Sequence, residues 1–130
     1  MKKKPRIPFS FVLENLHPKE PVVKPMFGCF AVYVDRKLVL VLRKKESARA
    51  DNGVWIGTSR EHHASLLKEF PSMRSLRLLG SVPTNWQNIP ESSDDFESEV
   101  LRACELIVKG DPRIGKIPKL KTRKKLNTRQ

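Results

Sequence analysis

The chain has 130 residues, of which 38% are hydrophobic and 31% are charged, and this length and composition fit one globular domain with a core of its own. Its apolar runs are only a few residues long, which excludes a transmembrane helix, and the basic start of the chain lacks the apolar segment of a secretory signal. We therefore expect a cytoplasmic protein with no membrane partner.

The net charge of +12 is concentrated at the two ends of the chain. Four of the first six residues are Lys or Arg, and residues 111–130 hold eight cations against one acidic residue. Basic segments of this kind bind phosphate backbones without sequence preference and in a salt-dependent way, whereas the alternative is a tail that only improves solubility. The cations predicted to contact nucleic acid are Lys116, Lys119, Lys121, Arg123, Lys124 and Lys125.

Hydrophobic periodicity and turn signals predict the element order α-β-β-β-α-β-β-α. Short turns between the strands favour a mainly antiparallel sheet in an α+β fold. Residues 1–8 are expected to be a basic flexible N-terminus, residues 9–110 a single domain and residues 111–130 a basic C-terminal tail. The expected elements are a helix over 9–16, strands over 29–34, 38–42 and 53–59, a helix between Thr58 and Pro71, strands over 76–79 and 84–89, and a helix between Ser92 and Gly110.

Two of these helices carry signals at their ends. Thr58 and Glu61 match a capping box, in which side chains satisfy the free N–H groups at a helix start. Asp94 and Asp95 stand where the helix dipole favours acidic residues. Gly110 suits the position just after the last helical turn.

The hairpin predicted over residues 29–42 is apolar on both faces of its strands. A sheet with one face in water would alternate apolar and polar residues. We therefore expect helices to cover one face of the hairpin, and further chain or a partner to cover the other. The residues predicted to form this interaction surface are Phe30, Val32, Val34, Leu38, Leu40 and Leu42.

The same region carries a family resemblance. Lys24-Pro25-Met26-Phe27-Gly28 and Tyr33-Val34-Asp35-x-Lys37-Leu38, with the predicted element order, resemble the N-terminal domain of the TfoX/Sxy competence regulators and the related MmcQ/YjbR-like proteins. The resemblance implies a two-layer α/β sandwich over residues 9–110, a regulatory role, and, from the YjbR-like proteins, DNA binding through wing-like hairpins. This chain departs from the TfoX pattern at Arg36, where that family has a turn glycine.

The sequence contains no recognisable catalytic set. His62 and His63 are adjacent, so they diverge on a helix and do not face one metal ion. The carboxylates after residue 90 are explained by helix capping, and Cys29 and Cys104 are expected to be buried free thiols. We therefore expect no enzymatic activity, no cofactor and no metal.

Three functions remain open from the sequence. The first is an interaction module that dimerises or binds a protein partner through its apolar hairpin. The second is an auxiliary nucleic-acid-binding protein that uses its basic termini. The third, ranked last, is a binder of a small anionic ligand near Trp55, Gly57 and Trp86. For the two tryptophans, packing in the core is favoured over base stacking.

Overall fold

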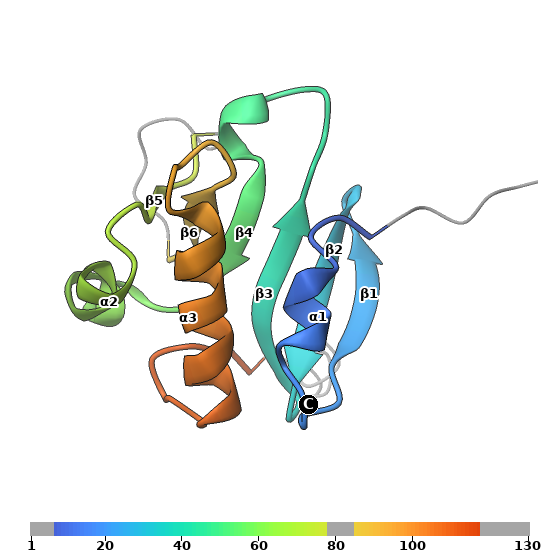
Figure 1. Ribbon diagram of the computed structural model, residues 1–130, viewed down its shortest axis with the longest axis vertical. Helices are drawn as coiled ribbons and strands as arrows, with labels where there is room; N and C mark the ends of the chain where they lie inside the picture. Colours follow the sequence, from blue (N-terminus) through green and yellow to red (C-terminus); the bar gives the residue numbers. More distant parts are fainter. Residues whose placement is uncertain (1–6, 78–84, 118–130) are drawn as a thin grey trace, which may run out of the picture.

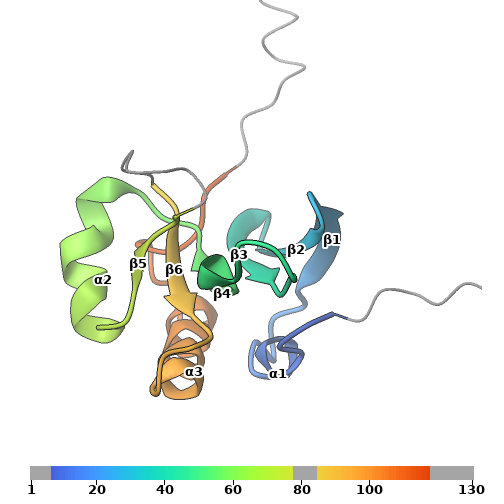
Figure 2. The same cartoon turned by 90° about the horizontal axis from the view of Figure 1, so that it is seen from above.

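The computed structural model describes residues 7–77 and 85–117. In this part of the chain, six strands form one antiparallel sheet in the order β1-β2-β3-β4-β6-β5. Three α-helices lie together on one side of the sheet (Figures 1 and 2). The elements are α1 (Phe11–Glu14), β1 (Val22–Met26), β2 (Cys29–Val34), β3 (Lys37–Arg43), the 3-10 helix η1 (Arg49–Asp51), β4 (Gly53–Ile56), the 3-10 helix η2 (Arg60–His62), α2 (His63–Glu69), β5 (Arg74–Ser75), β6 (Gln87–Pro90) and α3 (Phe96–Val108).

The predicted α+β class and the antiparallel sheet are confirmed, and the sheet holds one strand more than the predicted order. The additional strand is β1, which contains Pro25 and pairs only with β2. Proline lacks the N–H that an inner strand must donate, but it is tolerated on an edge strand. Pro25, which precedes the predicted hairpin, therefore lies within the edge strand of the described sheet.

Both turns of the β1-β2-β3 meander are two-residue loops in the left-handed region. Phe27 and Gly28 have φ angles of 51° and 79°, and Asp35 and Arg36 have φ angles of 52° and 70°. Two consecutive positive φ angles define a type I′ turn, whose twist matches that of the flanking strands. The turn at Arg36 therefore keeps the form that glycine adopts more readily, at the cost of steric strain in the arginine backbone.

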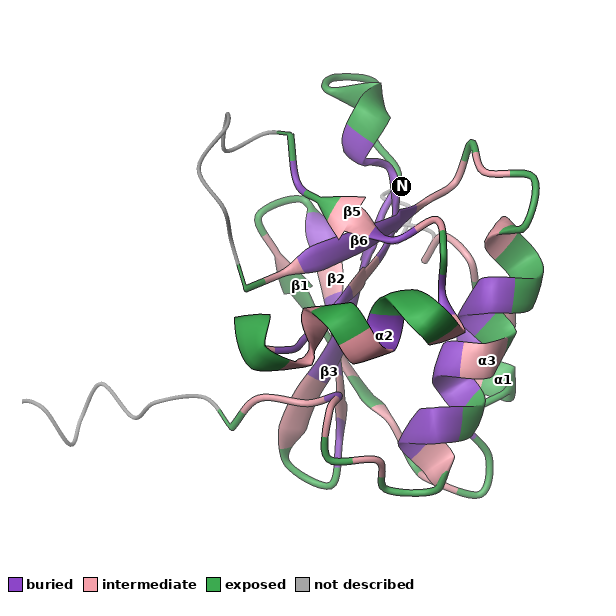
Figure 3. Ribbon diagram, turned by 90° about the vertical axis from the view of Figure 1, so that its left-hand side faces the viewer, coloured by how far each residue is buried: buried purple, intermediate pink, exposed green. Residues whose placement is uncertain are grey.

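The main core lies between the helices and the sheet. Leu40 of β3, Ile56 of β4 and Ile89 of β6 are fully buried beneath Val100 and Cys104 of α3. Buried and exposed residues alternate along α3 with the period of an amphipathic helix (Figure 3). This continuous apolar layer is the principal source of folding stability. Each Å² of apolar surface that is buried stabilises the folded state by about 25 cal/mol.

Several predicted boundaries differ from the structure. The expected capping box is wrong, because the Thr58 hydroxyl donates to the carbonyl oxygen of Arg113 at 2.7 Å, and α2 has no side-chain cap. Strand β5 ends at Ser75, before the strand expected over 76–79, and residues 78–84 lie outside the described part. Gly110 follows α3 with a φ of 79°, as the sequence predicted.

Candidate functional site: the second face of the sheet

The face of the sheet opposite the helices, hereafter the second face, carries a distinct set of side chains. Because paired residues of neighbouring strands point to the same side, the strand register places one residue from each strand in a continuous row. This row has a cation at each end and a tryptophan near its middle. It consists of Lys24, Ala31, Val41, Trp55, Asn88 and Arg74.

The centre of the second face is apolar. Cys29, Ala31 and Val41 are buried there, and their small side chains form a floor across β2 and β3. No α-helix among the described residues lies on this side (Figure 2). Larger side chains surround the floor and are only half buried, namely Met26, Tyr33, Leu38, Trp55 and Trp86.

Three aromatic rings and a cation make specific contacts on this face. The rings of Trp55 and Trp86 meet edge to face, with centroids 6.4 Å apart and planes at 62°. The indole N–H of Trp55 donates to the carbonyl oxygen of Asp51 at 2.9 Å, which fixes the orientation of the ring. The Lys24 ammonium lies 5.4 Å from the centroid of the Tyr33 ring, within the range of a cation–π contact.

A groove of about 320 Å³ lies at one end of the second face, between the β1–β2 turn and the loop over residues 44–52. Its floor is apolar, two aromatic side chains belong to its walls, and two of its lining residues are cations. No acidic residue lines it within the described part of the chain. The lining residues are Met26, Phe27, Cys29, Val41, Arg43, Lys45, Ser47 and Trp55.

The loop that forms one wall of this groove is held by a buried arginine and an asparagine. The Arg43 guanidinium is 3% exposed and donates to the carbonyl oxygens of Ala48 and Ser47 and to the Asn52 side chain, at 2.8 to 3.0 Å. Asn52 also accepts from the backbone N–H of Lys45 and donates to its carbonyl, both at 2.9 Å. These bonds hold the Lys45 backbone at the groove before any ligand binds.

Two cations act on the thiol of Cys29. Burial raises its pKa, and the nearby charges of Arg43 and Lys45 partly oppose that increase. Burial alone raises the pKa of Cys104 to about 12. Both thiols are free and buried, as predicted from the sequence. A neutral buried thiol is a weak nucleophile, so neither cysteine has the environment of a reactive one.

The C-terminal segment continues the sheet beside β4. Leu38 and Lys116 exchange two backbone hydrogen bonds, of 2.8 and 3.0 Å, at the start of β3, where β4 has already ended. Gly57 is the crossing point, because it donates to the Val39 carbonyl and accepts from Gly115. The folded unit therefore extends at least to Lys116, which pairs with Leu38 at the start of β3.

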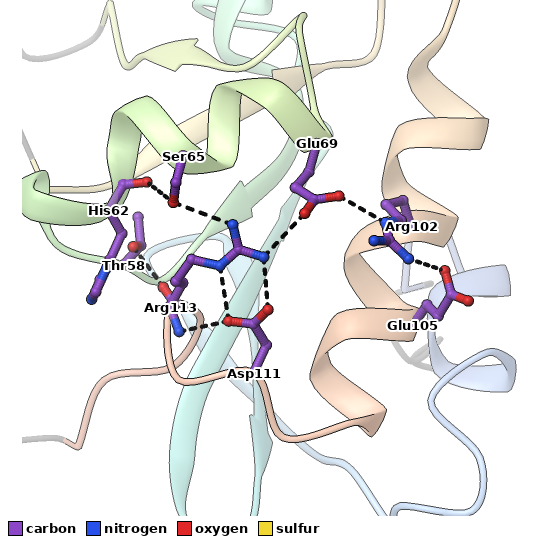
Figure 4. Close-up of polar contacts among 8 residues, drawn as sticks. All are labelled: Thr58, His62, Ser65, Glu69, Arg102, Glu105, Asp111 and Arg113. Carbon is purple, nitrogen blue, oxygen red and sulfur yellow. Dashed lines mark hydrogen bonds and ion pairs between the residues drawn. The ribbon is translucent and has the colours of Figure 1, made fainter.

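An ion-pair network on the helical side anchors this segment (Figure 4). The Arg113 guanidinium donates to Asp111 at 2.7 and 3.0 Å, to Glu69 at 3.1 Å and to the Ser65 hydroxyl at 3.2 Å. Glu69 also accepts from Arg102 of α3 at 2.9 Å. The network ties the segment after α3 to both α2 and α3, and thereby positions the start of the basic tail.

Hydrogen bonds in this network shift the pKa of its members. Bonds from Arg102 and Arg113 lower the pKa of Glu69, and the bond from Arg113 lowers the pKa of Asp111. The pKa of Arg113 is raised by its bond to Asp111. Every charge in the network is compensated, so we interpret it as a structural clamp.

The structure places the predicted interaction residues on both sides of the sheet. Val32, Val34, Leu40 and Leu42 are buried in the main core, and Phe30 packs against that core. Only Leu38 lies on the second face. Among the predicted nucleic-acid contacts, Lys116 pairs with the sheet, and the others lie outside the described residues, namely Lys119, Lys121, Arg123, Lys124 and Lys125.

Gly57, near which the sequence left a small anionic ligand open as the last-ranked function, has a structural role of its own. A side chain at Gly57 would place its Cβ 2.5 Å from the carbonyl oxygen of Leu38, so this glycine is required by close backbone packing. Within residues 7–77 and 85–117, no group of three or more His, Cys, Asp or Glu is placed to hold a metal ion. No helix in the same part is long and apolar enough to cross a bilayer.

Comparison of the chain with protein-family models, with curated proteins and with solved structures finds no match. The resemblance to TfoX-type domains therefore stays a prediction from the hairpin motif.

Proposed function

We propose that the protein is a non-enzymatic module that binds single-stranded nucleic acid on the second face of its sheet, assisted by its basic tail. The observation that carries the proposal is the grouping of Tyr33, Trp55 and Trp86 with cations on one sheet face that no described helix covers. Bases of single strands stack on exposed aromatic rings, and cations beside the rings bind the phosphates.

The charge of the second face supports an anionic partner. Lys24 lies on β1, Lys45 lies at the groove, and Lys116 lies at the end of the described C-terminal segment. Residues 118–130, which follow this segment in the sequence, contain six cations and no acidic residue. Nucleic acid would therefore meet stacking surfaces and phosphate contacts on one side of the molecule.

Self-association through the hairpin is the second candidate, and the apolar floor of the second face favours it. Two features weigh against it. A face-to-face dimer would enclose Lys24 and Lys45 of both copies in one interface, and no acidic residue lines the described groove to compensate them. Pairing at the β1 edge would meet Lys24 and Pro25, residue types that protect exposed edges from further strands. We therefore rank a dimer behind nucleic-acid binding.

The proposal is tested by titrating a fluorescent oligo(dT) of about 12 nucleotides, a length within the usual site sizes for such surfaces. Trp55→Ala is expected to weaken binding by about 1–3 kcal/mol, the contribution of one base–aromatic contact. Phe96→Ala is the matched control, because Phe96 is a half-buried aromatic residue that packs against Phe9 and Phe11 on the helical side. It should leave the affinity unchanged.

The contribution of the tail is measured by salt dependence. Deleting residues 118–130 removes six cations, so the slope of log affinity against log salt should decrease by up to about 4 for a single strand. If Trp55→Ala and Phe96→Ala both bind oligo(dT) with the affinity of the wild-type protein, the sheet-face mechanism is contradicted. Light scattering that shows a salt-resistant dimer without DNA binding would favour self-association instead.

A further inference from the structure

Phe27 has an unusual position for a phenylalanine. It is 90% exposed and lies at the tip of the β1–β2 hairpin, where its φ of 51° is in the left-handed region. Type I′ turns favour Asn, Asp or Gly at this position, because bulky side chains are strained there. The other turn of the meander uses polar residues, Asp35 and Arg36. Phe27 thus combines a strained backbone with a ring exposed to water, and folding stability explains neither property.

The ring of Phe27 lines the groove at the end of the second face. Trp55 lines the same groove, while Cys29 and Val41 contribute to its apolar floor. The groove of about 320 Å³ is at the small end of the ligand-pocket range of roughly 300–1,000 Å³. A single planar ring system with one attached phosphate is therefore a suitable occupant, and a larger ligand is not.

A cation of the groove, Lys45, lies beside the tip of the β1–β2 hairpin. A Cβ added to Gly28 would lie 2.9 Å from the Lys45 ammonium nitrogen, so that ammonium group lies against the turn beside Phe27. The backbone of Lys45 is fixed through Asn52. Since no described acidic residue lines the groove, this ammonium group is available to a ligand phosphate.

We infer that the groove binds one nucleotide of the bound single strand, with its base held between Phe27 and Trp55 and its phosphate at Lys45. This inference rests on the proposed function and names the subsite within it. Stacking between two aromatic rings is tolerant of sequence, so the subsite should accept any base. The exposed position of Phe27 leaves its ring free to close over the base, which accounts for an exposed aromatic ring on a strained backbone at the tip of the turn.

The two turns of the meander provide a matched test. Phe27→Asn produces the Asn-Gly pair and Arg36→Gly the Asp-Gly pair, the dipeptides that type I′ turns prefer. Both variants should therefore raise the midpoint of thermal unfolding slightly, through relief of backbone strain. Only Phe27→Asn should also weaken binding of oligo(dT), by at least about fivefold, which is the low end of the loss expected for one base–aromatic contact.

Additional variants separate stacking from apolar contact. Phe27→Trp should retain affinity, whereas Phe27→Leu should lose it, because leucine has no aromatic face. Free dTMP is used as a competitor, and it should displace the strand only weakly if the subsite serves one unit of a longer chain. Displacement by dTMP as effective as by unlabelled oligo(dT) would show a free-nucleotide site and overturn the assignment.

The outcomes distinguish this inference from the proposed function. If the wild-type protein binds oligo(dT) and Phe27→Asn binds equally well, the groove assignment is wrong and binding on the sheet face stands. If the wild-type protein does not bind oligo(dT), the proposed function fails and the subsite fails with it. A more stable Phe27→Asn variant with weaker binding excludes misfolding as the cause, and this is the result that the assignment predicts.

Discussion

The two faces of the sheet are built from the same strands but have different composition and cover. On the helical face, Leu40, Leu42 and Ile56 are completely buried under a layer of helices. On the second face, a floor of small residues is ringed by half-buried aromatic side chains and cations. The helical face therefore supplies most of the folding stability, because it buries the larger apolar layer. The second face is thereby left with aromatic and charged groups that folding alone does not require.

The largest expected effect separates the two faces within one strand. Leu40→Ala removes a fully buried side chain of β3 and should destabilise the protein by about 2–5 kcal/mol. Leu38→Ala changes a half-buried side chain on the second face and should cost clearly less. Urea denaturation measures both free energies of unfolding. Equal losses for the two variants would contradict the difference between the faces.

A smaller effect is expected where the C-terminal segment joins the sheet. Gly57→Ala would place a methyl group against the carbonyl oxygen of Leu38, and relief of this overlap requires movement of β3 or of the segment. Overpacking of this kind costs about 1–3 kcal/mol. Ala64→Gly, on the exposed surface of α2, has no such overlap and should cost no more than the roughly 1 kcal/mol of a glycine in a helix. If Gly57→Ala unfolds at the wild-type urea concentration, the close approach is absent in solution.

The stability that the clamp around Arg113 provides should depend on pH. The pKa values of Asp111 and Glu69 are lowered from ordinary values of 3.8 and 4.5, so their contribution to stability is present above these values and is lost as pH falls through the lowered ones. Asp111→Asn should cost about 1–2 kcal/mol at pH 7, through the weakened bonds to Arg113. The difference from wild type should shrink on acidification to about pH 3. An unchanged difference at that pH would show that the Asp111 charge contributes nothing.

The smallest effect on stability should accompany a measurable effect on binding. Lys24→Gln removes one cation–π contact at an exposed site and should cost less than about 1 kcal/mol of folding stability. The same change should reduce the salt slope of oligo(dT) binding by about 0.7, the contribution of one phosphate contact. Lys109→Gln, an exposed cation after α3, is the control and should leave that slope unchanged.

The sequence predicted the fold class and the helices over one face of the hairpin, because apolar runs on both sides of a strand are visible in the sequence itself. That further chain or a partner covers the other face stays a prediction. The sequence did not predict which residue faces which side. The register between β2 and β3 shifts at a bulge beside Val39, so Leu38 and Leu40 point to opposite faces although they are two residues apart. Strict alternation therefore assigned Leu38, Leu40 and Leu42 to one surface.

The candidate site was largely missed for a related reason. Trp55 and Trp86 stand among apolar residues in the sequence, which favoured core packing, and no local signal reveals that their face lacks a helix. The groove depends on the Arg43 and Asn52 contacts, which join residues in different elements. Arg113 was counted with the tail, whereas its partners on α2 and after α3 make it part of the fold. Such long-range contacts are not encoded in local periodicity.

The central claim is tested most directly by NMR spectroscopy of the ¹⁵N-labelled protein during titration with oligo(dT). The account predicts shifts of the indole N–H signals of Trp55 and Trp86 and of the backbone amides of Lys24, Tyr33 and Val41. Signals of the outer surface of α3 should not move. Shifts confined to residues 118–130, or centred on the helical face, would contradict binding on the second face of the sheet.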